Sequence, residues 1–156
     1  MITKQLILGL VFGISMSIIS WIVGMIVNSM LVKTKYYSKL SNLNFIKSES
    51  VNESIGLKQF KWIVKNTFFK FFNQAIQIKS RSTDLEVLRH QMTLSEISHL
   101  IGFIFVTIVM IYQIFAVGPV FGLAIIVGNV ILNLYPSLLQ QENKRRIDRL
   151  IERQKL

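Results

Sequence analysis

The chain has 156 residues, of which 51% are hydrophobic and only 17% charged, and its formal net charge at pH 7 is +10. So small a charged fraction argues against a soluble domain, and the absence of cysteine excludes disulfides and thiol chemistry. The composition predicts an all-α integral membrane protein that forms a single membrane domain over residues 1–156. Anionic lipid accounts for the excess of basic side chains, so no nucleic-acid partner is expected.

The first predicted span lies near the N-terminus. The 28 residues between Lys4 and Lys33 contain no Asp, Glu, Lys or Arg, and a bilayer core takes about 20 helical residues to cross. We place this span at about residues 6–28. Its apolar core is longer than that of a cleaved signal peptide, and no small-residue cleavage site follows it. The pattern therefore favours a retained membrane anchor over a signal peptide.

The polar middle of the chain predicts one amphipathic helix after an irregular connector. Residues 38–56 are rich in Ser, Asn and Glu, and we expect them to be irregular. Residues 58–79 have lysines on one helical face and apolar side chains on the other, which predicts a helix lying in the cytoplasmic interface. Either the helix only anchors the chain, or it forms a wall of a site for a lipid-like substrate. Its apolar face consists of Phe60, Val64, Phe68, Phe71, Ala75 and Ile78.

The second half of the chain predicts a membrane hairpin. The 45 residues between Glu96 and Glu142 contain no Asp, Glu, Lys or Arg, and His99 is the one histidine among them. Gly118-Pro119 stands at the midpoint of this run, and Gly and Pro mark turns. The sequence thus predicts spans at about 97–117 and 120–140. A basic helix at about 141–156 follows, and we expect its charged face to be solvated and to lie against the lipid.

The distribution of lysine and arginine predicts the orientation. Of the 18 basic residues, one precedes the first span, 11 lie between Lys33 and Arg89, none lies in the hairpin turn, and six follow from Lys144 onward. Cytoplasmic loops carry the basic excess. We expect a multi-pass protein of the cell membrane with its N-terminus outside and its C-terminus in the cytoplasm. Membrane lipid is then an obligatory partner, and self-association stays open.

Folding the hairpin at Pro119 brings two polar groups of residues together. Residue i then lies level with residue 238 − i, so Glu96 falls beside Glu142 and Asn143, and His99 beside Leu139 and Gln140. The third span also carries a polar stripe at helical spacing. The stripe consists of Asn129, Asn133, Ser137, Gln140 and Asn143. We therefore expect a polar cluster at the cytoplasmic boundary of the membrane.

Two interpretations of this cluster stay open. In the functional one, His99 is a general base oriented by Glu96, and Asn133, Gln140 and Asn143 position a polar substrate or its oxyanion. In the structural one, Glu96 complements the helix dipole, His99 reaches the lipid headgroups, and Asn133 holds helices together. No metal site is expected, because the two histidines and Glu96 do not form a recognised ligand pattern.

From Leu85 onward the chain resembles the glycosyl-4,4'-diaponeurosporenoate acyltransferases, small membrane proteins of carotenoid pigment synthesis. That family shows Glu-x-x-His-Trp at the opening of a span, which Glu96 to His99 match and Leu100 does not. The family then shows Asn-x-Pro and Gln-Arg-aromatic-Asn-Arg-x-Arg. Pro136 stands one place late, and Gln141-Glu142 replaces Arg-aromatic. The residues that keep the spacing of this second element are Asn133, Gln140, Asn143, Lys144 and Arg146.

The resemblance implies a membrane-bound acyltransferase that acts on a glycosylated, lipid-soluble, carotenoid-like acceptor. It implies no bound cofactor and a coenzyme A thioester as the acyl donor, reached from the cytoplasm. His99 and Glu96 would be the catalytic residues, and Lys144, Arg145 and Arg146 would hold the phosphates of the donor. The alternative function is that of a non-enzymatic small membrane protein, acting as a scaffold or a partner subunit.

Overall fold

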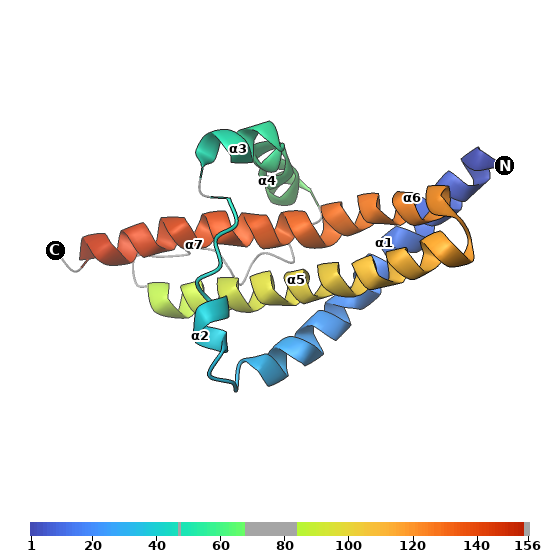
Figure 1. The fold of residues 1–156 in the computed structure, drawn as a ribbon. Coiled ribbons are helices and arrows are strands. Elements are labelled where there is room, and N and C mark those ends of the chain that lie inside the picture. The colour runs from blue at the N-terminus through green and yellow to red at the C-terminus, as the bar shows by residue number, and fades with distance from the viewer. Residues whose placement is uncertain (47, 68–83, 155–156) are drawn as a thin grey trace. The chain divides into compact units, whose positions relative to one another are not determined.

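The computed structural model describes residues 1–46, 48–67 and 84–154, and every regular element in these ranges is a helix (Figure 1). Three helical segments, Ile2–Leu31, Leu85–Ala116 and the continuous Pro119–Gln154, are long and apolar enough to cross a membrane. The prediction of an all-α protein with three membrane-spanning helices is thus confirmed. The elements are α1 (Ile2–Leu31), α2 (Tyr37–Leu40), α3 (Glu49–Ser54), α4 (Leu57–Asn66), α5 (Leu85–Ala116), α6 (Pro119–Asn129), the π-helix η2 (Val130–Leu134) and α7 (Tyr135–Gln154).

The chain divides into two compact units. The first unit consists of Met1–Tyr37 and Ile97–Ser137, and the second of Ser38–Glu96 and Leu138–Leu156. The helices α5 and α7 each contribute one part to either unit. Each unit has its own packing and its own polar contacts.

In the first unit, α1 buries its small residues and exposes its large apolar ones. The exposed side chains include Ile7, Val11, Ile14 and Ile18. Because lipid tails are as apolar as leucine, large side chains gain nothing by turning inward, and small ones let helices approach closely. This pattern is therefore typical of a helix surrounded by lipid. The buried face consists of Gly9, Gly13, Ser17, Ser20, Gly24 and Asn28.

The small face of α1 packs against α6 at van der Waals limits. A Cβ atom added at Gly13 would lie 2.7 Å from the Cα of Ile125. Figure 1 shows α5 and α6 joined by a short turn, in which Gly118 has a φ of 139° and Pro119 begins the next helix. Only glycine adopts such a φ readily, and proline is favoured at the first helical position. The predicted hairpin turn at Gly118-Pro119 is confirmed.

The basic C-terminal segment is not a separate helix. The chain stays helical from Pro119 to Gln154, so the helix that we expected to begin near residue 141 is the later part of α7. No glycine or proline follows Pro136, so nothing in the sequence favours a break there. Helix α5 likewise begins at Leu85, well before the apolar run, because Asp84 caps it. The Asp84 carboxylate accepts bonds from the backbone N–H groups of Glu86 (2.9 Å) and Val87 (3.1 Å).

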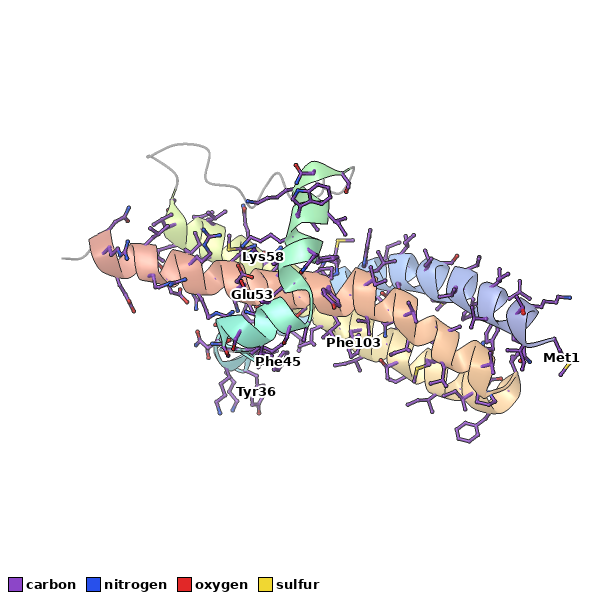
Figure 2. All side chains as sticks on the ribbon, turned by 90° about the horizontal axis from the view of Figure 1, so that it is seen from above. Met1, Tyr36, Phe45, Glu53, Lys58 and Phe103 are labelled. Atoms are coloured by element: carbon purple, nitrogen blue, oxygen red, sulfur yellow. The ribbon has the colours of Figure 1, made fainter. Side chains whose placement is uncertain are left out.

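The second unit has an apolar core between the early turns of α5 and the late turns of α7. Its members are Leu85, Leu88, Met92 and Ile147. Arg89 and Asp148, each next in sequence to a member of this core, form an ion pair. Figure 2 labels Glu53 and Lys58, an exposed pair whose charged atoms are 3.5 Å apart.

The middle of the chain differs in part from the sequence-based expectation. Residues 38–56 are not wholly irregular, because most of α2 and all of α3 lie there. Gly56 adopts a left-handed φ of 78° between α3 and α4, which only glycine adopts at no cost. Helix α4 begins at Leu57, one residue before the expected start, and ends at Asn66, because the chain is extended at Thr67. The expectation of one unbroken helix over residues 58–79 is therefore wrong. The rest of the predicted amphipathic helix, including Phe68, Phe71, Ala75 and Ile78, lies outside the described residues.

Candidate functional site

A series of neutral polar side chains links the helices of the first unit. Asn129 donates to the backbone carbonyl of Phe103 (3.0 Å) and to the hydroxyl of Thr107 (3.2 Å), both on α5. Asn133 donates to Ser20 on α1 (3.0 Å) and to the side-chain oxygen of Asn129 (2.9 Å). Asn129, Asn133 and Ser20 are fully buried. Amides and hydroxyls can thus connect all three helices without placing a charge in an apolar environment.

A proline follows a π-helical turn beside this series. The chain widens into the π-helix η2, where the Tyr135 N–H bonds to the carbonyl of Val130, and Pro136 has no N–H to donate to the preceding turn. The carbonyl of Leu132 accepts a hydrogen bond from the indole Nε1 of Trp21 on α1 (3.3 Å). A π-helical turn of this kind is frequent at functional sites.

His99 lies at the same place. Its ring packs edge-to-face against the indole of Trp21, with centroids 5.9 Å apart and planes at 82°. The imidazole also lies close to the side chain of Asn133 and to the carbonyl of Leu132. Its Nδ1 is buried and has no hydrogen-bond partner among the described residues. The ring is therefore held by its surroundings while one nitrogen stays open for bonding.

Two further buried atoms of the first unit lack a hydrogen-bond partner in the part of the chain that the structure describes. They are the Oδ1 of Asn133 and the Oγ of Ser137. Both N–H groups of Asn133 are already used, so this amide offers an acceptor and no donor. The geometry thus favours contact with a hydroxyl over stabilisation of an oxyanion.

Glu96 belongs to the second unit, and its partners are Gln141 and Lys144. Its Oε1 accepts a bond from Nε2 of Gln141 (2.9 Å), and its Oε2 pairs with the ammonium group of Lys144. Lys144 also donates to the backbone carbonyl of Ser41 (2.8 Å), and Gln141 accepts from the backbone N–H of Phe45 (2.9 Å). Glu96 and Lys144 are almost completely buried. A buried charge of this kind needs its partner, since desolvation is costly.

The remaining predicted residues lie on α7 with different exposures. Gln140 is buried and accepts a bond from Asn143 (3.4 Å). Arg145 donates to the side chain of Asn44 and to the backbone carbonyl of Ile46, whereas Arg146 is exposed. Of the three basic residues that the resemblance assigned to the donor phosphates, Lys144 faces Glu96, and Arg146 is the exposed one.

Sequence reasoning placed Glu96 near its partners but missed two neighbours of His99. The hairpin register put Glu96 level with Glu142, and its partners are Gln141 and Lys144 on either side of that residue. Trp21 was not selected, because a tryptophan in a span is usually an interfacial anchor. The irregular helical turn around Leu132 had a signal in Pro136, since a proline within a helical pattern removes one helical donor.

Comparison with known protein families agrees with the resemblance. A family model described as CrtO, glycosyl-4,4'-diaponeurosporenoate acyltransferase, matches residues 33–153. The match includes all seven predicted site residues, and it leaves out Trp21. A search of curated proteins and one of solved structures found no match. Because the matched segment covers most of the 156 residues, the chain belongs to the glycosyl-4,4'-diaponeurosporenoate acyltransferase family, membrane acyltransferases of a carotenoid-type pathway.

Proposed function

We propose that this protein transfers an acyl chain from a coenzyme A thioester to a sugar hydroxyl of a glycosylated, carotenoid-like acceptor. The observation that carries the proposal is the open Nδ1 of His99, a buried nitrogen without a hydrogen-bond partner among the described residues. A neutral imidazole accepts a proton at such a nitrogen. The family membership supplies the reaction class.

In the proposed reaction, Nδ1 of His99 takes the proton of the acceptor hydroxyl as its oxygen attacks the thioester carbonyl carbon. A carbon–oxygen bond forms, the carbon–sulfur bond then breaks, and the leaving thiolate takes the proton back from the imidazolium. The products are an ester and free coenzyme A. The side-chain oxygen of Asn133, also without a partner in the described ranges, accepts a hydrogen bond from the sugar and helps to orient it.

We assign other roles to Glu96 and Lys144 than those implied by the resemblance. Both are buried and paired with each other, so in this proposal they hold α5 to α7 within the second unit. Contact with the donor phosphates falls to the exposed Arg146. Gln140 and Asn143 stay candidates for contacts with the polar part of either substrate.

The proposed orientation follows from the charges. With residues 33–95 and the C-terminal segment in the cytoplasm, the donor reaches the protein from the side where coenzyme A thioesters occur. A reporter fused at Leu156 and one at Ser54 should give the same sidedness, and a tag at Met1 the opposite. Opposite signals from Leu156 and Ser54 would contradict the three-span arrangement.

The decisive experiment uses purified protein in lipid nanodiscs, radiolabelled palmitoyl-coenzyme A and glycosyl-4,4'-diaponeurosporenoate as probes. His99→Gln should lower ester formation per mole of inserted protein by about 10²–10⁴-fold, as expected when a general base is removed. His90→Gln is the matched control, because His90 is the other histidine of the chain and lies exposed on the same helix. Full activity of His99→Gln would refute the catalytic role. Absence of ester formation by the wild-type protein would favour the scaffold function.

A further inference from the structure

The inference concerns the side chain of Ser137, and it rests on the proposed function. Ser137 is fully buried, and its Oγ has no hydrogen-bond partner among the described residues. Hydroxyls inside helices commonly bond to the carbonyl one turn earlier, as Ser17 does with Gly13 (2.7 Å). Thr107 likewise donates to the carbonyl of Phe103 (2.7 Å). Ser137 has no such bond in the part of the chain that the structure describes, and a buried hydroxyl of this kind calls for a partner.

Ser137 lies at the level of His99, on the helix that runs antiparallel to α5. A Cβ atom added at Gly102 would lie 2.9 Å from the Oδ1 of Asn133, so Gly102 and Asn133 are level with each other. Ser137 follows Asn133 by four residues, which is about one helical turn on the same face. His99 precedes Gly102 by three residues, which is about one turn toward the same end of the pair. The two steps bring the hydroxyl and the imidazole to one level.

Three buried atoms that lack a partner in the described ranges therefore belong to one part of the first unit. They are Nδ1 of His99, Oδ1 of Asn133 and Oγ of Ser137. In the proposed reaction the first takes a proton and the second accepts a hydrogen bond, whereas a hydroxyl can also donate one. The thioester carbonyl oxygen gains negative charge when the acceptor attacks, and a donor aimed at this oxygen stabilises the transition state. The Ser137 hydroxyl can supply the donor that the other two atoms do not.

We infer that Ser137 is a further catalytic residue, whose hydroxyl donates a hydrogen bond to the thioester carbonyl oxygen as the tetrahedral intermediate forms. Serine keeps its proton throughout. The electron pair moves onto the carbonyl oxygen during attack and returns to form the ester carbonyl when the thiolate leaves. A serine nucleophile needs a base within bonding reach, but the Ser137 hydroxyl makes no bond to the imidazole in the described part of the chain.

The test measures ester formation by Ser137→Ala in nanodiscs with the same two substrates. The kcat should fall by about 10²–10³-fold, as when an oxyanion donor is lost. The Kd of the thioether S-hexadecyl-coenzyme A should not change, because this ligand has no carbonyl oxygen and the inferred bond belongs to the transition state. The midpoint of unfolding should stay or rise, since the change removes a buried hydroxyl without a partner. Ser137→Cys keeps a weaker donor, so its kcat should lie between those of the wild type and Ser137→Ala.

Ser17→Ala is the matched control, because it removes a hydroxyl of the same unit that is equally buried and already bonded. Its kcat should equal that of the wild type. A fully active Ser137→Ala, a lower midpoint of unfolding or a weaker affinity for the thioether would overturn the inference. An acyl group found on Ser137 by mass spectrometry, after palmitoyl-coenzyme A alone, would also overturn it.

The same assay separates this inference from the proposed function. If Ser137→Ala is fully active while His99→Gln is inactive, the proposed function stands without the inference. If the wild-type protein forms no ester, both are wrong.

Discussion

The two units of this protein satisfy their buried polar groups by different means. In the first unit, the buried bonds join amides, hydroxyls and backbone carbonyls, as Asn133 does with Ser20. In the second unit they also involve charges, as in Glu96 with Lys144. A lone charge in hydrocarbon costs several kcal/mol, whereas a neutral amide needs only a bonding partner. The first unit thus keeps charges out of its interior, whereas the second unit buries a charge together with its partner.

The largest effect is expected where a buried charge loses its partner. Lys144→Met leaves the carboxylate of Glu96 without its ammonium partner, which should lower the free energy of unfolding by about 3–5 kcal/mol. The measurement is denaturant unfolding of the detergent-solubilised protein.

The control for this prediction is the double variant Glu96→Gln/Lys144→Met, which removes both charges. It should recover most of the lost stability, since a buried pair replaced by neutral groups is often close to neutral. A double variant no more stable than Lys144→Met would contradict the ionic character assigned to the second unit.

The next largest effect concerns the small face of α1. Gly13→Ala places a Cβ 2.7 Å from the backbone of Ile125, so α1 and α6 must separate. Overpacking of this kind should cost about 1–3 kcal/mol. Ser15→Ala, on the exposed face of the same helix, should leave the unfolding midpoint unchanged. Equal midpoints for both variants would show that close packing does not hold the first unit together.

A smaller effect is expected for the neutral bonds of the first unit. A double-mutant cycle with Ser20→Ala and Asn133→Ala should give a coupling energy of about 0.6 kcal/mol, and at most about 1.7 kcal/mol, as for other hydrogen bonds between membrane helices. The same unfolding assay measures it. A coupling of several kcal/mol would erase the energetic contrast between the neutral bonds and the buried ion pair.

The smallest effect belongs to the partly exposed ion pairs of the second unit. The charged groups of Lys61 and Glu142 are 2.5 Å apart, with side chains 18% and 25% exposed. Lys61→Gln should cost at most about 1 kcal/mol. Lys58→Gln should have no measurable effect, because the side chains of Lys58 and Glu53 are 77% and 64% exposed. A larger loss from Lys58 than from Lys61 would show that burial does not decide the strength of these pairs.

The sequence by itself determined the spans and the turn between them. Charge-free runs of sufficient length predict membrane helices, and Gly118-Pro119 supplies both the left-handed φ and the helix start that a short hairpin needs. These are local properties, so they can be read without knowing what lies nearby. The hairpin register followed from the position of the turn, which is why Glu96 was placed within two residues of its partners.

The tertiary structure alone decided which polar groups face one another. Lys144, Arg145 and Arg146 look equivalent in sequence, but successive residues point in different directions around a helix, so one is buried against Glu96 and another is exposed. Pro136 indicates that one helical donor is missing, but only the packing of α1 against η2 lets the indole N–H of Trp21 donate to the carbonyl of Leu132. The environment of His99 depends on a residue 78 positions away in the chain, because the contacts that orient a side chain are made between helices and leave no local pattern in the sequence.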